Sequence, residues 1–271
     1  MLHRVLTLAQ SWRTAAEKDP IATDCRRCVG LYPNTTKCWE ESKASLGDYD
    51  GAMRRAYIES HCSLEESFRI GQRWAGENSV SLVAPSTRAV EASPWLERTN
   101  VPIGTIGNRR SRFDARPHGI VIAWCLGLEE LLDLEEYSGI DGVVLVRAYS
   151  GHAPWVTAFR VEHLGGQLVP PVDEPSAAIV ATVEGLSDTA VLNQGLTDPR
   201  ERSAAVQALT YLYKNGHQLD PDQLATEAIR NKWPRQAPLE LAKIARDLKS
   251  GRQIRFTQRL RPSILAEWSN K

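Results

Sequence analysis

Continuous apolar runs and amphipathic segments alternate in the middle of the chain. Residues 119–125 and 142–148 form largely apolar runs rich in Val and Ile, which is typical of strands buried on both faces. Between them, residues 128–137 carry leucines on one side and carboxylates on the other, which predicts a crossover helix. Residues 153–164 predict a second helix, and 167–169 a short strand. We therefore predict an α/β fold with a small, doubly wound, mostly parallel sheet and helical parts before and after it.

The same pattern divides the chain into three parts. Residues 1–75 have mainly helical spacing and are predicted to form a helical N-terminal region. Residues 76–185 are predicted to form the α/β domain, whose last helix begins at Ser176 and is closed by Gly185. Residues 186–271 are predicted to form a basic helical C-terminal module.

Three helices are predicted in this module. Asp198-Pro199 and Asp220-Pro221 each combine an acidic N-cap with proline at the first helical position. The first helix is expected to end at Asn215-Gly216 and the second at Trp233-Pro234, and the third to span residues 238–250. Short helices joined by tight turns resemble a helix-turn-helix in outline, although such bundles also serve purely as packing units.

Charge is balanced over the whole chain but not along it. The 33 basic and 33 acidic residues cancel, so no global field attracts nucleic acid. From residue 227 to the C-terminus, however, basic residues exceed acidic ones by about seven. Within this region, residues 252–261 alternate basic and apolar side chains. This alternation favours contact with nucleic acid. The alternatives are an added strand with Ile254 and Phe256 inward, or an arm that docks on the acidic remainder.

A second basic cluster lies in the loop before residue 119, where Arg side chains follow glycines. Arg forks suit phosphate groups and nucleic-acid backbones. The alternative is a solvated loop whose arginines pair with the acidic helix at 129–136. Our first hypothesis is a nucleic-acid-associated binding or regulatory protein, with DNA or RNA as partner. Its predicted contacts are Arg109, Arg110, Arg112, Arg116, Lys243, Arg246, Lys249, Arg252 and Arg255.

The second hypothesis is an enzyme or sensor for a nucleotide or another phosphorylated small molecule. Ligands of open parallel sheets bind beyond the carboxyl ends of the strands. The polar residues predicted there are Ser86, Thr87, Asn108, Ser150 and His152. Ser86 and Thr87 can equally be simple helix caps, and His152 a cap or surface residue. No catalytic signature is recognisable, so catalytic residues stay unassigned and a protein-interaction scaffold is a third alternative.

The spacing of the cysteines concerns a zinc cofactor, and the hydropathy concerns the cellular location. Cys25, Cys28 and Cys38, with Cys62 or His61 as fourth ligand, have the spacing of a zinc knuckle, although a second paired knuckle is missing. The alternative is that these cysteines are core and loop residues. No apolar run reaches membrane-spanning length and the N-terminus lacks an apolar signal block, so we expect a cytoplasmic protein without membrane contact.

Overall fold

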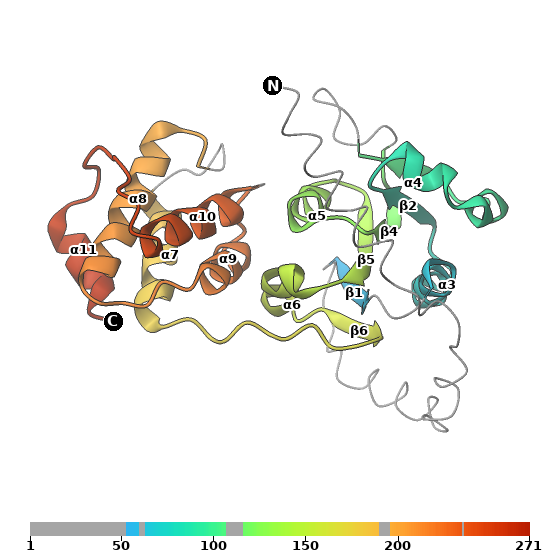
Figure 1. The fold of residues 1–271 in the computed structure, drawn as a ribbon, viewed down its shortest axis with the longest axis horizontal. Coiled ribbons are helices and arrows are strands. Elements are labelled where there is room, and N and C mark those ends of the chain that lie inside the picture. Colours follow the sequence, from blue (N-terminus) through green and yellow to red (C-terminus); the bar gives the residue numbers. More distant parts are fainter. Residues whose placement is uncertain (1–52, 60–62, 107–115, 190–195, 235) are drawn as a thin grey trace. The chain divides into compact units, whose positions relative to one another are not determined.

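The chain from Arg54 onward folds around a sheet of six parallel strands (Figure 1). The computed structural model describes residues 53–59, 63–106, 116–189, 196–234 and 236–271. The strands are β1 (Arg54–Glu59), β2 (Val80–Ala84), β3 (Ile103–Thr105), β4 (Gly119–Trp124), β5 (Ile140–Ala148) and β6 (Glu162–Gly165). Across the sheet their order is β3-β2-β4-β5-β1-β6, and every neighbouring pair runs parallel.

Helices cover both faces of this sheet. One face packs against α3 (Leu64–Ala75), α4 (Thr87–Glu91) and the 3-10 helix η2 (Pro94–Arg98), and the other against α5 (Leu128–Glu135) and α6 (Ala153–Phe159). In β4, Ile120 and Ile122 belong to the first core, whereas Val121 and Ala123 belong to the second. A strand buried on both faces needs apolar residues at every position. The predicted α/β class with a doubly wound parallel sheet is confirmed.

Strand β1 lies in a region for which helix was predicted. It occupies the sheet between β5 and β6, so the helical prediction for residues 1–75 is wrong at Arg54–Glu59. Only Ala56, Tyr57 and Ile58 are buried apolar residues there, and a run of three is too short to be distinguished from a helix segment. The side chains that pack against β1 come from other parts of the chain. For example, the Arg54 guanidinium of β1 lies 4.0 Å from the centre of the Trp74 ring of α3.

The chain also differs from the prediction after β5. The short 3-10 helix η3 (Ser150–His152) leads into α6, which ends at Phe159 and not at residue 164, because Arg160 adopts a left-handed conformation (φ 50°). Residues 162–165 then pair with β1 as the edge strand β6. The strand predicted at 167–169 does not form. Instead, the Val169 N–H donates to the Tyr57 hydroxyl at 3.3 Å.

Five helices follow around a core of their own. They are α7 (Ala177–Thr189), α8 (Pro199–Lys214), α9 (Pro221–Arg230), α10 (Ala237–Lys249) and α11 (Pro262–Ser269). The predicted starts of α8 and α9 are confirmed. The Asp198 carboxylate accepts from the backbone N–H groups of residues 200 and 201, and the Asp220 carboxylate from those of residues 222 and 223. The predicted third helix corresponds to α10.

Helix α7 does not end at Gly185, as the sequence suggested, but continues to Thr189. The reason is close packing: a Cβ atom on Gly185 would lie 2.2 Å from the Trp268 ring of α11. The glycine therefore permits two helices to approach and does not act as a helix terminator. Helix α11 itself was not predicted, although Pro262 stands at its first position and Leu265 and Trp268 form its buried side.

Residues 252–261 connect α10 to α11, and we call this segment the basic arm (Figure 1). The arm is not a strand, so the prediction of an added strand is wrong. Ile254 packs partly against the helical core, whereas Phe256 is 40% exposed. Residues 52–271 group into one unit, and the predicted domain boundaries stay predictions. Among the residues that the structure describes, no helix combines the length and the apolar character that crossing a bilayer requires.

Candidate functional site

The carboxyl edge of the sheet has a switch point between β2 and β4. The chain leaves β2 through α4 on one face of the sheet and leaves β4 through α5 on the opposite face, while the two strands are neighbours. Crevices for ligands form at such points in open α/β sheets. Ser86 follows β2 and Cys125 follows β4, so these residues lie at the switch point, and Ser150 and His152 lie one strand away, after β5.

His152 has a structural task at this edge. Its side chain is fully buried; Nδ1 accepts from the Tyr149 N–H at 3.1 Å, and Nε2 contacts the Leu126 carbonyl at 2.9 Å. The first bond requires an unprotonated Nδ1, so the proton is on Nε2, which donates to Leu126. Burial lowers the pKa of His152, and the hydrogen bond to the Leu126 carbonyl opposes this shift only in part. The imidazole thus holds two loops together and has no nitrogen left for a ligand.

The other polar residues predicted for this edge have different roles in the structure. The Ser86 hydroxyl caps α4 by accepting from the Ala89 N–H at 3.2 Å, and Thr87 is the first residue of that five-residue helix. This is the plain capping role. Ser150 is exposed in η3, and Asn108 lies outside the described residues. Of the predicted ligand residues, Ser86, Thr87 and Ser150 are therefore accessible.

Two residues at this edge were missed by the sequence analysis. Cys125 and Arg147 both adopt left-handed backbone conformations, with φ of 52° and 65°. Burial raises the pKa of the Cys125 thiol, while the nearby Arg147 guanidinium lowers it to a lesser extent. The thiol is consequently protonated at neutral pH, which does not favour a nucleophilic role. Arg147 is exposed and contributes a cation to this edge.

The C-terminal basic residues are all on the surface. Every Lys and Arg from residue 243 to residue 261 is exposed, namely Lys243, Arg246, Lys249, Arg252, Arg255, Arg259 and Arg261. Some are balanced by acids of α10: Lys243 pairs with Glu240 at 3.3 Å, and Arg252 with Asp247 at 2.7 Å.

Arg246 is near a further carboxylate. The pKa of Asp222 is raised by burial and by Asp220, and Arg246 is close enough to oppose that rise.

The remaining cations have no such partner. Within the described ranges, Lys249, Arg255, Arg259 and Arg261 form no ion pair. Arg259 and Arg261 were not on the predicted list. They follow Arg255 in a stretch, residues 249–261, that contains five basic and no acidic residues. The uncompensated positive charge is thus located at the end of α10 and on the basic arm.

A buried glutamine fixes the position of this arm. Gln207 of α8 is 6% exposed, and its Nε2 donates to the Leu260 carbonyl at 2.9 Å. Its Oε1 accepts from the backbone N–H groups of Arg259 and Leu260 at 2.8 and 2.9 Å. All polar atoms of the side chain except one N–H are therefore used on the arm. The end of the arm, at Arg259 and Leu260, is thus held against α8, while its arginine side chains are exposed.

The helix-turn-helix outline fits the structure poorly in one respect. A recognition helix contacts bases with its N-terminal residues. In α10 these residues are covered: Ala237 and Pro238 are buried, and Leu239 packs against the core that lies beside the sheet. Gln236, just before them, donates to Glu129 of α5. The start of α10 is thus not exposed for insertion into a groove.

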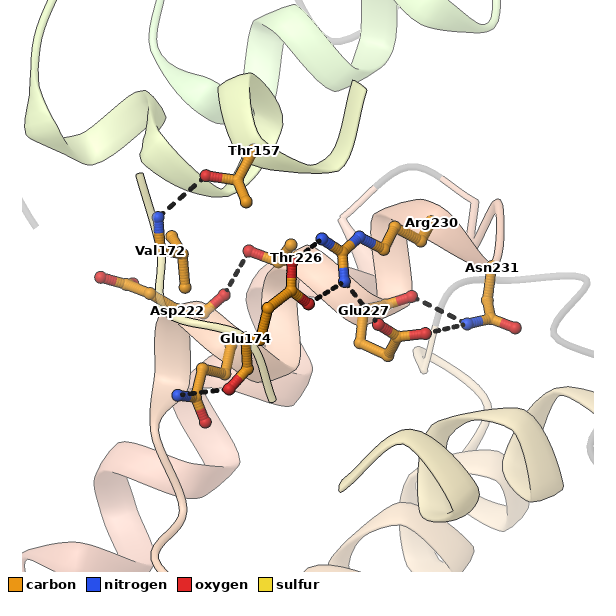
Figure 2. A network of polar contacts seen from close by, with 9 residues as sticks. Thr157, Val172, Glu174, Asp222, Thr226, Glu227, Arg230 and Asn231 are labelled. Carbon is orange, nitrogen blue, oxygen red and sulfur yellow. Dashed lines mark hydrogen bonds and ion pairs between the residues drawn. The ribbon is translucent and has the colours of Figure 1, made fainter. Parts of the chain in front are cut away.

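A polar network attaches the helical module to the α/β part (Figure 2). The Thr157 hydroxyl of α6 accepts from the Val172 N–H at 2.9 Å, in the segment that leads to α7. Two residues further along, Glu174 binds Arg230 of α9 through two bonds of 3.1 and 3.2 Å. Arg230 also binds Glu227, which is nearly buried. The linker is therefore held on both sides, and α9 packs on α6.

The other predicted site residues fall mostly outside the described ranges. Arg109, Arg110 and Arg112 lie there, as do Cys25, Cys28, Cys38 and Cys62. Arg116 is described and exposed; it donates to the Ser138 hydroxyl at 3.0 Å. No group of three or more His, Cys, Asp or Glu side chains arranged to hold a metal occurs in the described part of the chain. The zinc site stays a prediction.

Comparison with known proteins gives one match. The family model of a domain of unknown function (DUF1889) matches residues 176–269, about a third of the chain. This segment corresponds to α7–α11 together with the basic arm, so the helical module is similar to that domain. No curated protein and no solved structure matches the chain.

Proposed function

We propose that this protein binds nucleic acid, DNA or RNA, through the phosphate backbone, and that the basic arm and the end of α10 make the contacts. The observation that carries the proposal is the exposed positive charge of an arm whose end is fixed. Gln207 holds the backbone of Arg259 and Leu260, and Arg255, Arg259 and Arg261 are exposed without a carboxylate partner among the described residues. Arg forks pair with phosphate oxygens. Because the arm is already ordered, less conformational entropy is lost on binding.

The residues predicted on α10 and at the start of the arm contribute unequally to this proposal. Lys249 is unpaired in the described structure and adds to the arm, whereas Lys243 and Arg252 already have carboxylate partners. Exposed pairs of this kind are weak, since their net contribution is about 0–1 kcal/mol. A phosphate can therefore displace Asp247 from Arg252, which lies next to the free cations. The predicted contribution of Arg109, Arg110, Arg112 and Arg116 is a separate hypothesis.

The test is the salt dependence of binding. Phosphate contacts release counterions, so the logarithm of the association constant falls with the logarithm of salt concentration by about 0.9 per contact on duplex and about 0.7 on single strands. Fluorescence anisotropy with labelled oligonucleotides, from low to moderate NaCl concentration, measures this slope. In the double variant R255Q/R259Q, the slope should decrease by about 1.4 to 1.8.

Arg69→Gln is the matched control, because Arg69 is an exposed arginine of α3 that is paired with Glu65. It should leave both affinity and slope unchanged. The proposal fails if the wild type does not bind at low salt, or if R255Q/R259Q binds with the wild-type slope.

A second candidate function is binding of a phosphorylated small molecule at the sheet edge. It is favoured by the exposed Arg147, which stands beside the switch point in a strained backbone conformation (φ 65°). Ser86, Thr87 and Ser150 are accessible at the same edge. Thermal-shift measurements with a nucleotide panel test this candidate, since a ligand raises the melting temperature according to its occupancy. Arg147→Gln should abolish any such rise.

A further inference from the structure

The basic arm carries one exposed aromatic ring among its arginines. Phe256 is 40% exposed, and Arg255, Thr257 and Gln258 beside it are exposed as well. The other large apolar residue in this part of the arm, Ile254, packs partly against the helical core. The arm thus uses one apolar side chain for attachment and leaves the second in solvent, next to unpaired cations.

From this arrangement we infer that the arm binds single-stranded nucleic acid, with Phe256 stacked on an unpaired base. The inference rests on the proposed function and names its substrate class. In a duplex the flat faces of the bases are hidden by stacking on their neighbours, so an exposed ring finds no partner there. Proteins that bind single strands combine a basic track for the backbone with aromatic side chains on which bases stack. Residues 252–261 contain both parts in ten residues.

The rest of the helical module points in the same direction. Reading a duplex requires an element that enters a groove, most often the start of a helix. The start of α10 is covered by the core beside the sheet, and the neighbouring Gln236 is bound to Glu129. The exposed positive segment is instead a connection that is neither helix nor strand. Such a segment with spaced cations can follow a flexible strand, whose bases are free to turn toward Phe256.

The experiment compares single-stranded oligomers with a duplex of the same length. Anisotropy at fixed salt should give tighter binding of wild-type protein to single-stranded dT20 or U20 than to a 20-bp duplex. Phe256→Ala should weaken single-strand binding by about 5- to 150-fold, because one stacked base contributes that much. The duplex affinity and the salt slope should not change, because no charge is lost. Phe256→Tyr, which keeps the ring, should restore single-strand binding.

Leu168→Ala is the control for loss of an exposed apolar side chain, since Leu168 is 64% exposed and lies in the linker after β6. It should bind as the wild type does. If the wild type binds neither polymer, the proposed function fails. If the wild type binds both with salt dependence but Phe256→Ala loses nothing, or loses the same factor on duplex, only the stacking inference is overturned. Circular dichroism of each variant confirms that the fold is intact.

Discussion

Replacing Gln207 with leucine removes the attachment of the basic arm without changing its charge. Leucine has nearly the volume of glutamine, so the core around α8 stays filled. The three hydrogen bonds from the Gln207 amide to Arg259 and Leu260 are lost, however. The arm backbone must then either leave these groups unpaired or move away from α8 to bond with water.

Both outcomes lead to a similar loss of stability. An intramolecular hydrogen bond contributes about 0.5–1.5 kcal/mol net, so three of them give about 1.5–4.5 kcal/mol. If the arm detaches instead, Leu260, which is 7% exposed, loses its burial. Exposing a buried leucine costs about 1.5–3 kcal/mol. We expect Gln207→Leu to lower the free energy of unfolding by about 2–4 kcal/mol, mainly through a lower urea midpoint.

Limited trypsin digestion gives an independent measurement. The arm offers Arg255 and Arg259 to the protease, and cleavage there should be faster in Gln207→Leu because a detached segment fits the protease more readily. Gln253→Leu is the control, since Gln253 is exposed and makes no hydrogen bond in the described structure. It should change stability by less than about 0.5 kcal/mol. Unchanged stability together with unchanged digestion of Gln207→Leu would show that Gln207 does not hold the arm.

Two further predictions concern the α/β part. The Glu135 carboxylate accepts from Arg55 through bonds of 2.6 to 3.2 Å and from the buried Trp155 indole at 2.8 Å; Glu135→Ala should therefore cost about 3–5 kcal/mol in urea unfolding. Glu135→Gln should cost less because it keeps an acceptor, and Glu65→Gln, in an exposed pair with Arg69, should cost under about 1 kcal/mol. The second prediction is a pH dependence from His152, whose folded pKa is lowered by burial. The unfolded chain then binds the proton more readily, so this contribution is complete above pH 6.5 and falls as the pH decreases below it. Between pH 7.5 and 5.5 the loss is up to about 1.4 kcal/mol, and urea unfolding of His152→Gln should lack it, whereas the exposed His118→Gln should keep it.

The central strands of the sheet were predictable because their environment leaves a direct trace in the sequence. β4 and β5 are buried on both faces, which requires apolar residues at consecutive positions. β1 and β6 carry no comparable signal. β6 is an edge strand of four residues with half-buried side chains, and its place depends on pairing with β1, which lies about a hundred residues earlier in the chain. Pairing at such separation is a property of the folded chain and not of a local pattern.

The residues at the sheet edge were predicted only from their position after a strand, and not from a local sequence pattern. A histidine after a strand can face solvent or core, and its local sequence does not decide between them. His152 faces the core because its ring nitrogens bind the Tyr149 N–H and the Leu126 carbonyl, and only the fold brings these groups together. Arg147 was not predicted as a site residue because the residues around it in the sequence are apolar. It stands within an apolar strand, where the irregular pairing of β5 with β1 is not visible in the sequence.

The distribution of free charge, in contrast, was partly readable from the spacing of residues. Glu240 lies three residues before Lys243 on one helix, a spacing that brings such side chains together, and the structure shows this pair. The basic arm has no acid within it, so no local partner can neutralise its arginines. Within the described residues, the unbalanced charge therefore lies at the end of α10 and on the arm, away from the start of the helix that resembles a recognition helix. Under the proposed function, a segment that presents cations without entering a groove would select nucleic acid by charge and by stacking but not by base sequence.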